Sequence, residues 1–132
     1  MEEATLRLTH VFIITDNIER MLSFYRDVLL IEPQPDSGNY VEFVTEGTTL
    51  SLGTVALQES LAPGSAKPAS NHSTMFEIQV DDVDKEYERL QKMDIEWVKP
   101  PTTQPWGNRS IYFRDPDGNL LNFYTRVAQQ QT

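Results

Sequence analysis

Two spacings of hydrophobic residues follow one another at the start of this chain. Residues 6–14 are mostly apolar or β-branched, which predicts a strand. After Asp16 and Asn17, which are typical helix-capping residues, apolar side chains recur at three- and four-residue spacing. These residues are Ile18, Met21, Leu22, Tyr25, Val28 and Leu29. The pattern predicts a strand followed by an amphipathic helix.

Short apolar runs separated by turn residues come next. Pro33 and Pro35 follow the helix, and residues 40–45 and 48–52 predict two strands joined around Gly47. The first half of the chain is therefore predicted to run in the order strand, helix, then two or three strands.

The same order returns in the second half. Residues 75–83 align with residues 10–18 without a gap, so that Met75 corresponds to His10. A helix is predicted over residues 83–93 and a strand over residues 95–99 that stops at two prolines. Two further strands, residues 109–114 and 119–125, flank a turn of sequence Asp-Pro-Asp-Gly, whose Asp115 and Asp117 we interpret as structural. Such an internal repeat changes the fold that is expected.

The repeat sets the predicted organisation of the chain. We expect a single domain over residues 1–132, with a first module of about residues 5–54 and a second of about residues 73–125. A Pro-, Ala- and Ser-rich linker of about residues 55–72 joins them, and residues 126–132 form a tail.

Composition excludes several classes of function. Eleven Lys and Arg residues against twenty Asp and Glu residues give a formal net charge of −9, which argues against nucleic acid or an anionic membrane surface as a partner. The absence of cysteine excludes disulfides, thiolate metal sites and cysteine nucleophiles. Only two histidines are present, so one chain cannot form a three-histidine metal site. No apolar stretch is long enough for a signal peptide or a membrane span, and we expect a cytoplasmic protein.

Two short motifs give the repeat a family resemblance. The segment Phe24-Tyr25-Arg26-Asp27-Val28-Leu29 and the segment Asp115-Pro116-Asp117-Gly118-Asn119 lie in a duplicated strand-helix-strand-strand-strand unit. Together they resemble the vicinal oxygen chelate superfamily, which includes glyoxalase I, extradiol dioxygenases, fosfomycin-resistance enzymes and bleomycin-resistance proteins. The resemblance covers about residues 5–125. It implies an α+β fold in which two tandem βαβββ modules form a curled mixed sheet with a concave ligand site, and it implies a homodimer.

The resemblance also indicates where a metal would be bound. Metal-using relatives take one ligand from the first and one from the last strand of each half, usually His or Glu. Here these positions carry His10, Ser51, Met75 and Asn122, of which only His10 is a usual ligand for zinc, nickel, manganese or iron. His72 precedes Met75 by three residues and would lie on the other face of a strand. We therefore predict no metal ligands and no cofactor, and a divalent metal held through His10 is the alternative.

Strand alternation extends the set of residues on the concave face. A strand that turns Met75 inward also turns Glu77 inward, and Tyr112 faces inward if its neighbours Ile111 and Phe113 face the helices. Trp106 precedes this strand, where relatives often carry an aromatic residue that covers the ligand. The predicted ligand-binding residues are His10, Phe12, Ser51, Met75, Glu77, Trp106, Tyr112, Asn122 and Tyr124.

Three of these residues have a second interpretation. His10 is a hydrogen-bonded residue of the wall, or a base or ligand. Glu77 is a buried anion that awaits a cationic ligand, or a solvated group at the mouth of the cavity. Trp106 covers the ligand, anchors the turn, or contacts another protein. No catalytic residue is predicted.

The predicted function follows from this wall of aromatic, small polar and acidic groups. We expect a metal-free binding protein of the bleomycin-resistance kind, which sequesters an aromatic or cationic small organic molecule. One alternative is a glyoxalase-like lyase or dioxygenase with a degenerate metal site at His10. Another is a metal-free isomerase with Glu77 or His10 as general base.

Overall fold

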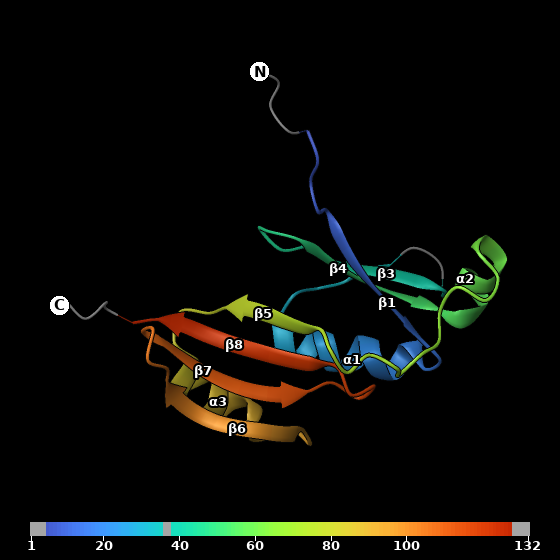
Figure 1. Cartoon of the computed structure of the whole chain (residues 1–132). Coiled ribbons are helices and arrows are strands. Elements are labelled where there is room, and N and C mark those ends of the chain that lie inside the picture. The colour runs from blue at the N-terminus through green and yellow to red at the C-terminus, as the bar shows by residue number, and fades with distance from the viewer. Residues whose placement is uncertain (1–4, 36–37, 128–132) are drawn as a thin grey trace. The chain divides into compact units, whose positions relative to one another are not determined.

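The chain divides into two compact units, residues 1–68 and residues 69–132, each built on a sheet of its own (Figure 1). The computed structural model describes residues 5–35 and 38–127. Within that part of the chain, none of the helices is long and apolar enough to cross a membrane.

The first unit contains four strands and two helices in its described part. The strands are β1 (His10–Thr15), β2 (Gln34–Pro35), β3 (Tyr40–Phe43) and β4 (Thr49–Thr54), and the helices are α1 (Ile18–Leu29) and α2 (Val55–Leu61). The sheet order is β1-β4-β3-β2. β1 runs parallel to β4, whereas β3 is antiparallel to both of its neighbours. The unit is thus a βαβββ module, followed by α2.

Helix α1 covers one face of this sheet. The Asn17 side chain caps the helix by accepting a hydrogen bond of 3.2 Å from the backbone N–H of Arg20. Of the predicted apolar stripe, Met21, Tyr25 and Val28 are buried and the other three residues are half-buried. The ring of Tyr25 lies 6.3 Å from that of Phe43 on β3. Because side chains alternate along a strand, the neighbouring Glu42 lies on the opposite face.

The second unit repeats this arrangement. Its elements are β5 (Met75–Gln79), α3 (Val83–Leu90), β6 (Glu96–Thr103), β7 (Asn108–Arg114) and β8 (Leu120–Arg126). The sheet order is β5-β8-β7-β6, with β5 parallel to β8. The predicted α+β fold of two βαβββ modules is confirmed.

A series of aromatic side chains packs α3 onto its sheet. Tyr87 on α3 contacts Trp97 on β6, Trp97 contacts Phe113 on β7, and Phe113 contacts Phe123 on β8. The ring centroids are 4.9, 5.4 and 5.3 Å apart, in the tilted and edge-to-face geometries that aromatic pairs prefer. Phe113 and Phe123 are buried, so this face forms the core of the second unit.

Two predicted strands have different bounds in the structure. The first begins at His10 rather than Leu6, because β4 itself begins at Thr49, opposite His10, and Leu6 is 92% exposed. β6 does not stop at Pro100 but continues to Thr103. β6 lies at the edge of its sheet and has register shifts between residues 97 and 102, and edge strands with bulges tolerate proline.

The other boundary differences concern the segments between and after the modules. The predicted linker contains helix α2, which is seven residues long and is capped by the Thr54 hydroxyl accepting from the Leu57 N–H at 3.1 Å. A helix this short shows little periodicity, and the sequence pattern did not indicate it. Arg126, assigned to the tail, belongs to β8. Within the modules, the second predicted helix ends at Leu90 rather than Met93, and the remaining predicted strands differ from the structure by one or two residues at their ends.

The turn between β7 and β8 is held by one carboxylate. Asp115 accepts hydrogen bonds from the backbone N–H groups of Asp117 and Asn119, both at 2.9 Å, and from the Asn119 side chain at 2.8 Å. Gly118 has φ of 91°, a conformation that favours glycine. This bonding accounts for the structural role predicted for Asp115.

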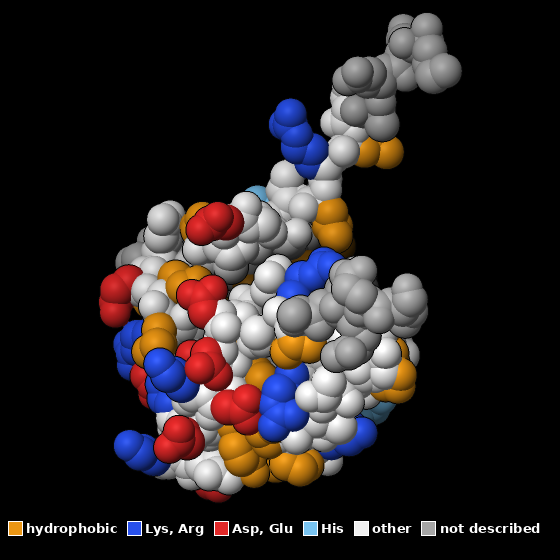
Figure 2. Space-filling view, turned by 90° about the vertical axis from the view of Figure 1, so that its left-hand side faces the viewer, with side chains coloured by type: hydrophobic (Ala, Val, Ile, Leu, Met, Phe, Trp, Pro, Cys, Tyr) orange, Lys and Arg blue, Asp and Glu red, His pale blue; other side chains and the backbone are white. Residues whose placement is uncertain are grey.

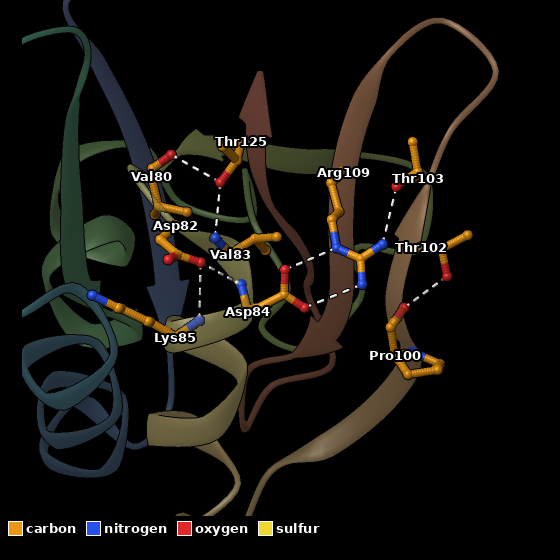
Figure 3. A network of polar contacts seen from close by, with 10 residues as sticks. All are labelled: Val80, Asp82, Val83, Asp84, Lys85, Pro100, Thr102, Thr103, Arg109 and Thr125. Atoms are coloured by element: carbon orange, nitrogen blue, oxygen red, sulfur yellow. Dashed lines mark hydrogen bonds and ion pairs between the residues drawn. The ribbon is translucent and has the colours of Figure 1, made fainter. Parts of the chain in front are cut away.

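A polar network joins the start of α3 to β7 and β6 (Figure 3). Arg109 on β7 donates to both carboxylate oxygens of Asp84, at 2.9 and 3.1 Å, and to the Thr103 hydroxyl at 3.0 Å. The Thr125 hydroxyl accepts from the Val83 N–H and donates to the backbone carbonyl of residue 80. The hydrogen bonds from Arg109 hold the pKa of Asp84 below its ordinary value of 3.8.

The Asp84–Arg109 pair predicts a small acid-sensitive contribution to stability. Because the pKa of Asp84 is lower in the folded state, its stabilisation is present above the ordinary value of 3.8 and is lost as the pH falls through the folded-state pKa. Asp84→Asn should reduce the free energy of unfolding by about 0.2–1 kcal/mol at pH 7, as for exposed ion pairs. Urea unfolding at pH 7 and at about pH 3 measures this, and the difference should be smaller at the lower pH. Asp94→Asn, in the exposed segment after α3, serves as the control, and a loss that persists undiminished in acid would contradict the prediction.

Candidate functional site

The face of the first sheet opposite α1 carries a row of polar and aromatic side chains. β-Sheet pairing aligns Phe12 on β1, Ser51 on β4 and Glu42 on β3, and alternation adds His10 and Tyr40 to the same face. Ser51 is fully buried, Phe12, Tyr40 and Glu42 are half-buried, and His10 is exposed.

Hydrogen bonds in this row converge on one oxygen of Glu42. Its Oε2 lies 3.1 Å from His10 Nε2 and accepts from the Tyr40 hydroxyl at 2.8 Å. The Tyr40 hydroxyl also lies 2.9 Å from Ser51 Oγ. His10 Nδ1 is 2.9 Å from the Thr9 hydroxyl. Since an ionised carboxylate only accepts, His10 Nε2 carries a proton, and both nitrogens of the ring are engaged.

An aromatic pair lies beside Glu42. The rings of Phe12 and Tyr40 meet edge to face, with centroids 5.4 Å apart. The Phe12 ring lies over Gly53 of β4, where a Cβ atom would be only 2.4 Å from two of its carbons. Glycine at this position therefore makes room for the Phe12 ring.

The second sheet carries a corresponding row on the face opposite α3. Pairing aligns Glu77 on β5, Asn122 on β8 and Tyr112 on β7, whereas the neighbours of Tyr112, Ile111 and Phe113, are buried on the other side. Asn122 Nδ2 donates to Glu77 Oε2 at 3.1 Å. Asn122 is 4% exposed, and its Oδ1 has no hydrogen-bond partner among the described residues.

The structure gathers the predicted site residues within each unit. His10, Phe12 and Ser51 share the row described on the first sheet. A single face of the second sheet carries Met75, Glu77, Tyr112, Asn122 and Tyr124. Trp106 lies in the turn between β6 and β7, next to Gly107 with φ of 105°, and is 66% exposed. It belongs to neither sheet face.

Sequence reasoning missed two residues of the first row, Tyr40 and Glu42. Both lie on β3, a middle strand, whereas the family comparison directed attention to the first and last strands. The alternation of Tyr40, Val41, Glu42 and Phe43 contains the signal, because the two apolar residues are buried and the two polar ones face the other way.

Comparison with known proteins now identifies the family. Residues 7–123 match the family model described as the Glyoxalase/Bleomycin resistance protein/Dioxygenase superfamily. The chain belongs to this superfamily. The predicted resemblance is therefore confirmed over almost all of the described chain.

Individual relatives are distant. The metallothiol transferase FosB of Shouchella clausii (strain KSM-K16) is 29% identical over 125 residues, covering 94% of this chain and 83% of the relative. The uncharacterized protein YraH of Bacillus subtilis (strain 168) is 25% identical and covers 90% of this chain and 98% of the relative. A crystal structure of a superfamily member from Nocardioides superposes with a TM-score of 0.79 at 23% identity, covering 99% of this chain and 91% of that chain. These likenesses establish ancestry and fold.

Of the four positions at which metal-using superfamily members are expected to place ligands, only His10 carries a usual ligand residue here. Ser51 is engaged with Tyr40, Asn122 with Glu77, and His10 with Glu42 and Thr9. Met75 offers only a thioether, a soft ligand that hard and borderline divalent ions do not favour. Among the described residues, no group of three His, Cys, Asp or Glu side chains is placed to hold a metal ion. The residues present do not fit the metal site of this superfamily.

The contact between Gly53 and Phe12 predicts the effect of adding one methyl group. In Gly53→Ala the new Cβ would force the Phe12 ring away from Tyr40, and overpacking of this kind costs about 1–3 kcal/mol. Denaturant unfolding measures the loss, and NMR measures the displacement of the Phe12 ring. Gly47→Ala is the matched control, because its Cβ would meet only the Thr45 hydroxyl at 3.8 Å. Equal stability of the two variants would contradict the prediction.

The unpartnered oxygen of Asn122 predicts an unusual response to an apolar substitution. A buried acceptor without a donor costs about 1–3 kcal/mol, and Glu77 is exposed enough for water to replace the lost hydrogen bond. Asn122→Leu should therefore leave the free energy of unfolding unchanged or raise it by up to about 1 kcal/mol.

Asn119 provides the matched comparison for Asn122. Its side chain donates to Asp115 at 2.8 Å and accepts from Asn71 at 3.0 Å, so Asn119→Leu removes two hydrogen bonds and should be clearly destabilising. Thermal and urea unfolding of both variants test the contrast. A larger loss for Asn122→Leu than for Asn119→Leu would show that the interpretation of Asn122 is wrong.

Proposed function

We propose that this superfamily member binds a small aromatic or cationic organic molecule on a sheet face opposite its helix, α1 or α3, and does so without a metal cofactor. The observation that carries this proposal is the state of the four expected ligand positions. Three of them are engaged in hydrogen bonds with neighbouring side chains, and the fourth is Met75. A divalent ion would have to break these bonds and would gain one imidazole, one hydroxyl, one amide and one thioether in return.

The chemistry of the two faces supports an organic ligand. The first face offers the Phe12–Tyr40 aromatic pair next to the Glu42 carboxylate, and the second offers Glu77 and Tyr112 on either side of Asn122. Binding sites for small molecules usually combine such apolar surfaces with a few polar groups that orient the ligand. No lysine or arginine forms an ion pair with Glu42 or Glu77 in the described part of the chain, which favours a ligand with positive charge.

General-base catalysis has less support. His10 is the only imidazole on either face, and both of its nitrogens are already hydrogen-bonded. A substrate would therefore have to displace the Thr9 hydroxyl or Glu42 to reach a nitrogen of this ring. This arrangement fits a residue of the binding wall, which was one of the two interpretations drawn from the sequence.

Family membership supports three finer elements of the proposal. The protein forms a homodimer, acts in the cytoplasm, and lowers the free concentration of its ligand, as an antibiotic-resistance protein would. The relatives include proteins named metallothiol transferase FosB. The ligand positions expected from the superfamily resemblance carry Ser51, Met75 and Asn122 here, which supports a function without a metal.

Metal binding is the decisive test of the proposed function. Protein purified without chelators should contain no stoichiometric transition metal by elemental analysis. Addition of Zn²⁺, Mn²⁺ or Ni²⁺ should not raise the midpoint of thermal unfolding, because a metal that binds the folded state tightly would stabilise it by mass action. A stoichiometric metal that is lost in His10→Ala would overturn the proposal and favour a glyoxalase-like or transferase activity.

Ligand binding is tested on the same preparation. Cationic glycopeptide antibiotics should quench tryptophan fluorescence with a Kd in the micromolar range or tighter, that is, a binding free energy of about −8 kcal/mol or more favourable. Folded protein that shows neither quenching nor thermal stabilisation with any aromatic or cationic compound tested would count against the proposal.

A further inference from the structure

We propose that Glu42 anchors the positively charged group of the ligand, and that this group is an aromatic amidinium or a similar N–H-bearing cation attached to a ring. This inference rests on the proposed function and assigns the ligand class and the subsite within it. The subsite consists of Glu42, Phe12 and Tyr40, all on the face of the first sheet opposite α1.

The hydrogen bonds of Glu42 leave one oxygen for a ligand. Both donors, His10 and Tyr40, meet Oε2, and no hydrogen bond to Oε1 is formed within the described residues. These two contacts fix the orientation of the carboxylate before a ligand arrives. The Glu42 side chain is 28% exposed, so Oε1 can accept from an incoming group while Oε2 stays bonded to the protein.

The charge of Glu42 has no fixed counter-ion. Its only ion-pair partner among the described residues is His10, which carries a charge only when it is protonated. Hydrogen bonds from a cation to a carboxylate are roughly twice as strong as those between neutral groups. A ligand cation with N–H donors would therefore gain more from Glu42 than a neutral ligand of the same shape.

The aromatic pair specifies what the cation is attached to. Phe12 and Tyr40 stand on β1 and β3, on either side of β4, and Gly53 gives the Phe12 ring its place. Two rings in contact provide a rigid apolar surface against which a flat ring can pack, and their faces also attract cations. An aromatic amidinium satisfies both features, because its charge and its ring are joined in one plane.

Attraction of the ligand cation depends on the Glu42 carboxylate rather than on a broad acidic surface. Figure 2 shows acidic side chains interspersed with basic ones on the face that it draws, with apolar side chains between them. Opposite charges that alternate over a surface largely cancel at distances beyond a Debye length of about 8–10 Å. Recognition of a cation therefore depends on the carboxylates that it contacts, and Glu42 lies beside the Phe12–Tyr40 pair.

The experiment uses benzamidinium as the probe and the full-length protein. NMR titration should shift the signals of Phe12, Tyr40 and His10 with a Kd of about 1 mM or tighter, as expected for a ligand of this size. Benzamide, which has the same shape but no charge, should bind at least about tenfold more weakly, and so should benzamidinium to Glu42→Gln. Glu42→Gln keeps the size of the side chain and its acceptor oxygen, and its dispersed spectrum serves as the check of folding.

Two control variants isolate the carboxylate. Glu46→Gln, in the exposed turn between β3 and β4, and Glu88→Gln, exposed on α3, should both retain the affinity of the parent protein for benzamidinium. If Glu42→Gln is poorly folded, the comparison of benzamidinium with benzamide on the parent protein still tests the requirement for a charge.

Three results would overturn this inference: no binding of benzamidinium, equal binding of benzamide, or equal affinity in Glu42→Gln. Its failure can be separated from failure of the proposed function. An antibiotic that quenches tryptophan fluorescence equally in the parent and in Glu42→Gln would remove the role of Glu42 and leave the proposed function standing. A stoichiometric metal held through His10 would instead overturn the proposed function.

Discussion

Parallel pairing between the first and the last strand of each unit is the constraint on which the rest of the structure depends. β1 pairs with β4 and β5 with β8, although a helix and further strands separate the members of each pair along the chain. Parallel strands cannot be joined by a tight turn, so the helix is needed to return the chain to the same end of the sheet. The helix then covers one face, and its apolar stripe packs against that face.

This pairing also produces the candidate sites. It aligns Phe12 with Ser51 in the first unit and Glu77 with Asn122 in the second, and antiparallel pairing adds Glu42 and Tyr112 to the same rows. Each row lies on the face opposite the helix, because the alternate residues of the same strands form the core. The two rows occupy corresponding positions in the two modules, yet their chemistry differs. The first is a hydrogen-bonded carboxylate with aromatic rings, and the second is a carboxylate–amide pair.

The positions expected to carry metal ligands lie on the same sheet faces as these rows. A serine hydroxyl in place of a His or Glu is short, and at Ser51 it takes part in a hydrogen-bonded chain with Tyr40 and Glu42. Asn122 engages Glu77 in a similar way, at the cost of one buried oxygen without a donor. At the ligand positions expected from the superfamily resemblance, His10, Ser51 and Asn122 are therefore bonded to neighbouring side chains, and this bonding is the basis of the proposed metal-free function.

The sequence by itself determined the fold to within a few residues, because the repeat, the capping residues Asp16 and Asn17, and the spacing of apolar residues are all local signals. It also determined which residue types occupy the expected metal positions, since alignment of the two halves needs no coordinates. Local patterns failed where neighbouring strands decide the outcome: residues 6–9 have a strand-like pattern but no strand to pair with, and Pro100 is accommodated because β6 is an edge strand. The role of Glu42 was decided by tertiary structure alone. Its two partners come from β1 and from its own strand, and which of its oxygens they occupy depends on distances of a few tenths of an ångström, which no pattern of residue types encodes.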